Sequence, residues 1–154
     1  MYNIEIKKTD STNPDFQSLV KLLDADLAIR DGDDHDFYHQ FNGIDSLKHC
    51  LVLYKDNQAV ACGAIKSYDD KTAEVKRMFV LDSERGQGFA SRLLKELEVW
   101  AWDLGYDKLI LETGINQPEA ISLYKKLGYS IIENYGQYKD LETSICFEKT
   151  YIVK

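Results

Sequence analysis

Apolar and polar side chains follow patterns that divide the first part of the chain into a strand and a helix. Residues 2 to 8 alternate with a period of two, which predicts a strand. Residues 14 to 30 carry apolar side chains at steps of three and four, which predicts a helix that starts at Asn13 and Pro14. Residues 35 to 41 follow an acidic loop and favour a short second helix.

The middle of the chain reads as a series of strands. Two apolar runs cover residues 49 to 55 and 58 to 67, and Asp56 and Asn57 between them favour a tight hairpin turn. A third run covers residues 72 to 81 after a polar break. Consecutive strands joined by short breaks predict an antiparallel meander.

The last part alternates helices with strands. An apolar stripe with a period of 3.6 residues predicts the chain's strongest helix, which Gly105 closes. A buried strand at residues 108 to 113 is followed by a helix that begins at Pro118. Two further strands are expected at residues 129 to 134 and 143 to 150.

These elements predict one domain, residues 1–154, of the α/β (α+β) class. Its centre would be a mixed, mostly antiparallel sheet flanked by helices on both faces. The chain has only 2 prolines and no Ser/Gly-rich stretch, so nothing marks a linker. A chain of this length buries about two-thirds of the surface that its unfolded form exposes, which is enough for a core without disulfides.

The excess of acidic over basic side chains bears on which kinds of partner the protein could bind. The chain has 19 basic and 26 acidic side chains and a formal net charge of −7. Duplex binding requires clustered basic side chains, so this balance argues against a nucleic-acid partner. The apolar runs are far shorter than the roughly 18 residues of a membrane span, and the first residues lack the apolar centre of a secretory signal. We therefore expect a cytoplasmic protein without a membrane partner.

Cysteine and histidine positions do not favour a metal site. Cys50, Cys62 and Cys146 are widely spaced and lie in apolar runs, which predicts buried reduced thiols. His35 and His39 are four residues apart beside several aspartates, a spacing that metal sites use. A solvated acidic loop explains the same pattern, and the loop lacks the ligand spacing of a calcium loop, so we predict no metal.

The segment richest in chemistry is a strand, a turn and the start of a helix, and the turn contains Arg85, Gly86 and Gly88. The glycines let backbone amides approach a ligand closely, and the helix start adds partial positive charge to that of Arg85, so a pyrophosphate fits. The turn lacks the Gly-Lys-Ser/Thr ending of a Walker A loop, and Ser91 stands where a dinucleotide fingerprint needs a third glycine. A glycine turn with a surface arginine is the alternative that these residues leave open.

Two segments resemble the signatures of the GNAT superfamily, the acetyl-CoA-dependent N-acetyltransferases. Residues 85–90 resemble its Arg/Gln-x-x-Gly-x-Gly/Ala motif, and residues 116–129 resemble its second signature. The resemblance implies a GNAT-like fold with acetyl-CoA as cosubstrate, whose pantetheine arm binds the preceding strand and whose pyrophosphate binds the loop. The cofactor-binding residues that it implies are Met78, Phe79, Val80, Arg85, Gly86, Gln87, Gly88, Phe89, Ala90, Ser91, Asn116 and Tyr124.

The same resemblance implies catalytic roles. Acetyl transfer from a thioester to an amine needs a base for the amine, a donor to the developing oxyanion and an acid for the departing thiolate. Tyr124 would be the acid, although a core aromatic is the alternative because Ala120 and Leu127 share its helix face. The oxyanion donor would be a backbone amide near Val80.

Two carboxylates are candidates for the base. Residues 74, 76, 78 and 80 share one face of a regular strand, so Glu74 would face the cleft beside the thioester. An exposed carboxylate paired with Lys76 or Arg77 is the alternative reading of Glu74. Glu112 is the second candidate, because it ends a strand whose other residues look buried. An ionisable side chain in a buried strand is costly and suggests a function.

The acceptor site has the weakest sequence signal. Acidic residues around positions 31 to 36 would attract a cationic amine. The candidate substrate-binding residues are Arg30, Tyr38, Arg77 and Glu112, with Tyr135 and Tyr138 as further candidates.

The resemblance implies transfer of an acetyl group to a primary amine, either of a small molecule or, as the alternative, of a peptide. No cysteine stands beside a base in the sequence, so we expect direct attack in a ternary complex. The alternative is a noncatalytic acyl-CoA-binding or sensing module. A homodimer is a further expectation, because residues 144 to 151 are rich in β-formers and could pair with a second copy.

Overall fold

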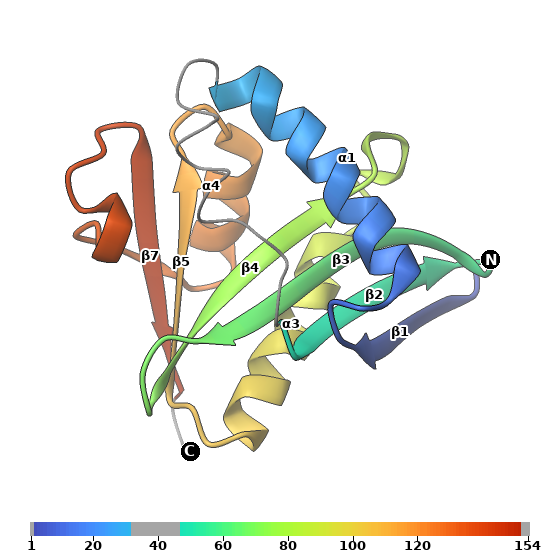
Figure 1. Ribbon diagram of the computed structural model, residues 1–154, viewed down its shortest axis with the longest axis horizontal. Coiled ribbons are helices and arrows are strands. Elements are labelled where there is room, and N and C mark those ends of the chain that lie inside the picture. The colour runs from blue at the N-terminus through green and yellow to red at the C-terminus, as the bar shows by residue number, and fades with distance from the viewer. Residues whose placement is uncertain (1, 32–46, 152–154) are drawn as a thin grey trace.

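The computed structural model describes residues 2–31 and 47–151, with the side chains of Arg30 and Asp31 not described (Figure 1). The predicted short helix at residues 35 to 41 lies outside these residues. Seven strands form one sheet: β1 (Ile4–Thr9), β2 (His49–Lys55), β3 (Gln58–Ser67), β4 (Thr72–Val80), β5 (Lys108–Gly114), β6 (Ser130–Ile132) and β7 (Ser144–Thr150). The helices are α1 (Pro14–Asp31), α3 (Phe89–Asp103) and α4 (Pro118–Lys126), with short 3₁₀ turns at Asp82–Glu84 and Gly136–Tyr138.

Helices cover both faces of the sheet (Figure 1). The helix α1 packs on one face through Phe16, Leu19 and their neighbours, in a core cluster with Phe79. The helices α3 and α4 pack on the other face, where Leu97 and Tyr124 belong to one larger cluster. The sheet has the order β1-β2-β3-β4-β5-β7-β6, with β4 and β5 parallel and the other neighbours antiparallel. The predicted fold class is confirmed.

The predicted hairpin between β2 and β3 is also present. Lys55 pairs with Gln58, which leaves Asp56 and Asn57 as the two turn residues. Both have positive φ angles, 50° and 70°, as the common two-residue turn of a β-hairpin requires. Asparagine and aspartate tolerate this conformation better than other residues with a side chain, so the local sequence specifies the turn.

The strands β4 and β5 are paired over only part of their length. Three residue pairs join them, from Thr72 with Lys108 to Glu74 with Ile110. Beyond these pairs the two strands separate, as the diverging arrows in Figure 1 show. A gap therefore lies between β4 and β5 in the second half of β4. This is the half that leads into the glycine turn, the turn that contains Gly86 and Gly88.

A β-bulge in β4 accompanies this separation. Cys62 pairs with Phe79 and Ala64 with Lys76, so two residues of β4 stand opposite Gly63 alone. One of the two is Arg77, whose φ of 60° lies in the left-handed region that side chains rarely occupy.

The bulge reverses the alternation that the sequence predicts for β4. Val75 packs on the α3 side before the bulge, whereas Met78 and Val80 pack on that side after it. The expectation that residues 74, 76, 78 and 80 share one face is therefore wrong. Glu74 lies on the face of the sheet that α1 covers, whereas Met78 lies on the α3 face. The Glu74 side chain borders the gap between β4 and β5 from the α1 side.

The expected free edge at β7 is not present. The strand β7 lies between β5 and β6, and β6 pairs with it through Ser130, Ile131 and Ile132. The homodimer that we expected through β7 therefore lacks its structural basis, because the sheet ends at β1 and at β6 within the described residues.

Two further expectations can be compared with the fold. Cys50, Cys62 and Cys146 are all buried and none is in a disulfide, which confirms the reading of buried thiols. No helix among the described residues is long and apolar enough to span a membrane.

Candidate active site

Two cavities meet where β4 and β5 separate. The sheet cavity, of about 110 Å³, is lined mainly by the diverging parts of the two strands, including Glu74, Arg77 and Glu112. The loop cavity, of about 270 Å³, is lined by the end of β4, the glycine turn and the first residues of α3, with α4 opposite. Met78 and Tyr124 line both cavities.

The glycine turn leaves one wall of the loop cavity open. Gly86 and Gly88 have φ angles of 83° and 81°, and no atom beyond the adjoining residues lies within 4 Å of where a Cβ would stand at either residue. The backbone conformation, and not crowding, therefore requires glycine at these positions. Gly88 is the N-cap of α3 and no side chain caps it, so the first amide groups of the helix have no partner inside the helix.

Arg85 is held beside this helix start by three groups. Its Nε donates to the carbonyl oxygen of Val80 at 3.1 Å, and its Nη1 pairs with Asp82 at 3.2 Å. Its Nη2 lies 3.8 Å from the carboxylate of Asp26 in α1. The guanidinium is thus positioned at the loop cavity with part of its surface exposed, which suits an anionic ligand.

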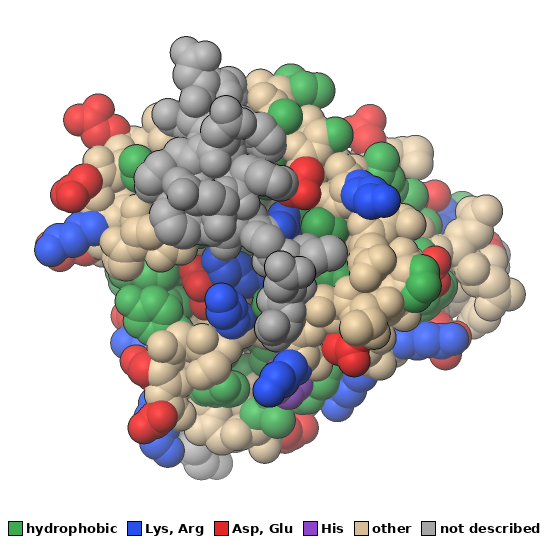
Figure 2. All heavy atoms as spheres, in the orientation of Figure 1, with side chains coloured by type: hydrophobic (Ala, Val, Ile, Leu, Met, Phe, Trp, Pro, Cys, Tyr) green, Lys and Arg blue, Asp and Glu red, His purple; other side chains and the backbone are tan. Residues whose placement is uncertain are grey.

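The sheet cavity contains charged side chains from both strands. Arg77 is buried and pairs with Asp24 of α1, with Nη1 and Oδ1 2.8 Å apart. This ion pair connects the bulge of β4 to α1 across one face of the sheet. Figure 2 shows basic and acidic side chains side by side near the middle of this face.

Glu74 is buried at the point where the strands separate. Its Oε2 accepts a hydrogen bond from the hydroxyl of Tyr135 at 2.6 Å, and its Oε1 lies 3.4 Å from the Lys76 ammonium. The residue is only 7% exposed, so the expectation of an exposed carboxylate is wrong, although the expected pairing with Lys76 is present. Burial and the nearby Glu74 charge raise the pKa of Tyr135, so its hydroxyl keeps the proton that it donates.

Glu112 lies on β5 on the same side of the cavity. Its Oε2 accepts a hydrogen bond from Ser144 of β7 at 2.8 Å. Tyr138 lines the cavity between the two carboxylates, and its hydroxyl lies 3.5 Å from the Lys76 ammonium. Burial, followed by the charges of Glu112 and Glu74, raises the pKa of the Tyr138 phenol.

Tyr124 lies in α4 at the junction of the cavities. Its ring packs against Tyr129 and Phe147, with centroids 5.9 and 5.6 Å away. Burial is the main cause that raises the pKa of the Tyr124 phenol, and the charge of Glu112 adds to it. The phenol is therefore neutral and carries a proton at ordinary pH.

Most of the residues predicted from the sequence lie in these two cavities. All the expected cofactor-binding residues line the loop cavity except Gln87 and Asn116. Gln87 instead contacts Glu84, and Asn116 is exposed in the turn after β5. Of the expected substrate-binding residues, Arg77 and Glu112 line the sheet cavity. Tyr38 and the side chain of Arg30 lie outside the described residues.

Several residues that line the cavities were not among those predicted from the sequence. Leu23 and Gln117 line both cavities, and Asp26 lines the loop cavity. Asp24 and Asp26 occur in a helix with many polar residues, so only the packing of α1 over β4 identifies them. Gln117 follows Asn116 directly, and the position of the second signature could have indicated it.

Metal binding has no support in this region. Among residues 2–31 and 47–151, no group of three or more His, Cys, Asp and Glu side chains could hold a metal ion. His35, His39 and the acidic loop that contains them lie outside the described residues, so the structure does not test that alternative.

Comparison with known proteins identifies the family of this chain. The sequence model of the acetyltransferase (GNAT) family matches residues 16–129, which is most of the chain. The chain therefore belongs to this family.

Two curated relatives illustrate the similarity. The chain is 38% identical over 100 residues to the IAA acetyltransferase of Azospirillum brasilense, a match that covers 64% of this chain. It is 29% identical over 98 residues to the uncharacterized N-acetyltransferase YsnE of Bacillus subtilis, which covers 62% of this chain. Each match spans 65% of the relative's own length.

Solved structures share the fold over nearly the whole chain. An acyl-CoA N-acyltransferase structure from Klebsiella pneumoniae is 29% identical, with a TM-score of 0.81 and 99% of both chains covered. A GNAT family acetyltransferase from Elizabethkingia anophelis, solved with acetyl-CoA bound, has 21% identity and a TM-score of 0.68, with 96% of this chain and 98% of that chain covered.

Proposed function

We propose that this protein transfers the acetyl group of acetyl-CoA to the primary amine of a small molecule, by direct attack in a ternary complex. The main support for this proposal is the position of Tyr124, which borders the loop cavity on one side and the sheet cavity on the other. A thioester that lies between the two cavities would present its carbonyl group to an amine in the sheet cavity and its sulfur to the phenol.

The loop cavity fits the anionic part of acetyl-CoA. The uncapped start of α3, the open backbone at Gly86 and Gly88 and the guanidinium of Arg85 together offer donors to a pyrophosphate. The end of β4 at Met78, Phe79 and Val80 would bind the pantetheine arm, as the family resemblance implies. Relatives in this family have been solved with acetyl-CoA or coenzyme A bound, which supports the same assignment.

The sheet cavity suits the amine end of a small acceptor. A cavity of about 110 Å³ lined by Glu74 and Glu112 attracts an ammonium group, which is how a primary amine arrives at neutral pH. Arg77 is neutralised by Asp24. The Lys76 ammonium, which also lines the cavity, pairs with Glu74. The three carboxylates of Asp24, Glu74 and Glu112 outnumber these two basic side chains, so the attraction remains.

Acetyl-CoA, when bound, supplies a thioester whose carbonyl carbon accepts the amine nitrogen. We assign the base to Glu74, because Tyr135 fixes one of its oxygens while the other already faces an ammonium, that of Lys76, at 3.4 Å. Glu74 first takes one proton from the arriving ammonium, which frees the nitrogen lone pair for attack. The nitrogen loses its second proton as the amide forms, and that proton replaces the one that Tyr124 gives to the sulfur. A backbone amide near Val80 would donate to the carbonyl oxygen as negative charge develops on it. Tyr124 gives its proton to the sulfur as the carbon–sulfur bond breaks.

A panel of primary amines tests this function. The protein would be incubated with acetyl-CoA and each amine, with release of the free thiol followed by absorbance and the acetylated product by mass spectrometry. We expect thiol release that depends on the amine, together with one acetyl group on the product. Tight binding of acetyl-CoA without transfer to any amine would instead favour a noncatalytic acyl-CoA-binding module.

A further inference from the structure

A carboxylate lines the loop cavity at the place where the proposed function puts a pyrophosphate. Glu84 is the last residue of the 3₁₀ turn that precedes Arg85, and its side chain borders the cavity. Two like charges at close range repel each other, and a repulsion in an anion site lowers affinity. A cation beside Glu84 would remove this difficulty.

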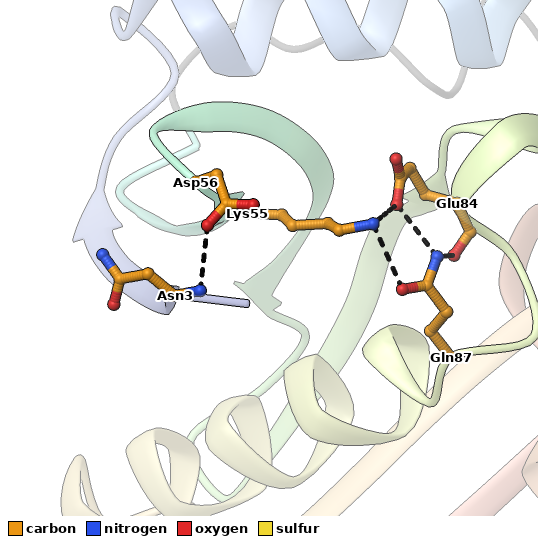
Figure 3. A network of polar contacts seen from close by, with 5 residues as sticks. All are labelled: Asn3, Lys55, Asp56, Glu84 and Gln87. Carbon is orange, nitrogen blue, oxygen red and sulfur yellow. Dashed lines mark hydrogen bonds and ion pairs between the residues drawn. The ribbon is translucent and has the colours of Figure 1, made fainter. Parts of the chain in front are cut away.

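Lys55 is that cation, and it comes from a distant part of the sequence. Its Nζ donates to Oε2 of Glu84 at 2.8 Å, and the two side chains are only 14% and 20% exposed. Figure 3 shows the Lys55 side chain extending from the end of β2 to the turn that follows β4, whereas its neighbour Asp56 contacts Asn3. The limited exposure means that salt screens this pair incompletely.

Gln87 completes the contacts of the Glu84 carboxylate. Its amide nitrogen donates to Oε2 of Glu84 at 2.9 Å and to the Glu84 carbonyl at 3.2 Å, while its oxygen lies 3.3 Å from Nζ of Lys55. The Lys55 ammonium and the Gln87 amide hold the pKa of the Glu84 carboxyl below its usual range, so the carboxylate stays charged. A charged Glu84 therefore depends on Lys55 for its neutralisation.

We propose that Lys55 is a specificity-determining residue that makes the loop cavity accept an anionic cosubstrate by neutralising Glu84. This inference rests on the proposed function, because it assumes that the loop cavity binds the phosphates of coenzyme A. Lys55 is the last residue of β2, directly before the turn to β3 and outside both GNAT signatures. Among the described residues it lines neither cavity. Its effect passes through Glu84.

Calorimetric titration with coenzyme A of the wild-type protein and three variants tests the inference. We expect Lys55→Met to weaken binding about tenfold, because it leaves the Glu84 charge unmatched. Glu84→Gln alone should tighten binding, because it leaves the positive charge of Lys55 unmatched beside the anion site. The double variant should recover an affinity within about threefold of the wild type.

The double variant separates charge from loop ordering. If Lys55 mainly ordered the turn through hydrogen bonds, the double variant would bind as weakly as Lys55→Met, and the inference would be wrong. Unchanged affinity in Lys55→Met would also overturn it. Lys55→Arg keeps the charge and should bind like the wild type, whereas thermal unfolding of every variant shows whether the fold is intact.

A second ligand and a matched control complete the test. Pantetheine lacks the phosphates, so Lys55→Met should not change its affinity, measured by NMR titration. Lys71→Met removes an exposed charge at the opposite end of β4 and should leave coenzyme A binding as in the wild type. Failure of the wild-type protein to bind coenzyme A would contradict the proposed function itself, whereas equal binding by all variants would contradict only the role of Lys55.

Discussion

Tyr124 has two roles in the structure, as a packed aromatic and as a wall of both cavities. The ring contacts with Tyr129 and Phe147 explain why the residue is only 6% exposed. The same burial raises the pKa of the Tyr124 phenol, which keeps it protonated. The alternative reading of Tyr124 as a core residue is thus compatible with the acid role, because the same burial serves both.

Replacing Tyr124 by phenylalanine separates these roles. The ring and its packing remain, so we expect little change in thermal stability or in KM for acetyl-CoA. Without the phenolic proton, kcat should fall by at least about 100-fold, as is usual when a general acid is lost. Steady-state kinetics with the amine found in the panel would measure this, and an unchanged kcat would remove Tyr124 from the mechanism.

The two carboxylates of the sheet cavity can be separated in the same way. We expect Glu74→Gln to lower kcat by about 100-fold or more, and Glu112→Gln by less than about tenfold. Tyr135→Phe is the matched control, because it removes the 2.6 Å hydrogen bond but leaves the carboxylate in place. The reverse order of effects would assign the base to Glu112.

At the scale of elements, the limits of helices and strands were predictable and the shape of β4 was not. Periods of two and 3.6 residues depend on local side chains, so the predicted strand at 108 to 113 differs from β5 by one residue. The bulge depends on a left-handed Arg77, a conformation that its side chain gives no reason to expect. The sequence therefore placed Glu74 in the cleft correctly, but it placed Glu74 on the wrong face of β4 relative to Met78.

The Arg77–Asp24 ion pair connects α1 to the bulge, and its loss should destabilise the fold. Asp24→Asn leaves the Arg77 guanidinium, whose side chain is only 3% exposed, without its anionic partner. We expect the free energy of unfolding to fall by about 2 kcal/mol, less than for a fully buried pair because Asp24 is partly exposed. Denaturant unfolding measures this loss.

Asp103→Asn provides the control for this prediction. It makes the same change at an exposed position at the end of α3. We expect it to alter the free energy of unfolding by no more than about 0.5 kcal/mol. Equal effects of the two substitutions would show that the Arg77–Asp24 pair does not stabilise the connection.

At the scale of the whole molecule, the sequence located the loop cavity but not the junction of the two cavities. Glycines at 86 and 88 with Arg85 are local signals, and they identified the residues that now line the loop cavity. The sheet cavity instead arises from the short pairing of β4 with β5 and from the packing of α1 and α4 around it. Long-range contacts of that kind have no periodic pattern in the chain.

Buried thiols and phenols make the free energy of unfolding of the whole molecule depend on pH above about pH 9. Burial raises the pKa of Cys146 to about 11 and that of Cys50 to about 12, from a usual value of 9.0, and it raises the pKa values of four buried or partly buried tyrosines. The unfolded chain therefore loses these protons first as pH rises, so the stability that these groups contribute is complete below about pH 9 and falls above it.

Denaturant unfolding at several pH values measures this pH dependence. We expect the free energy of unfolding to decrease by about 6 kcal/mol between pH 9 and pH 10.5, because each group contributes up to about 1.4 kcal/mol per pH unit once the pH exceeds its usual pKa. Between pH 7 and pH 8.5 these groups should contribute no change. A constant stability up to pH 10.5 would contradict the burial of these side chains.

Titration of the wild-type protein with acetyl-CoA tests the central claim most directly, with ATP and NAD as controls. At a concentration about 100 times its dissociation constant, acetyl-CoA should add about 2.7 kcal/mol of stability. For a chain of this length that corresponds to a rise in Tm of several degrees, which neither control should produce. Absence of both a shift and measurable heat at millimolar acetyl-CoA would contradict the account, because the glycine turn would then be only a turn.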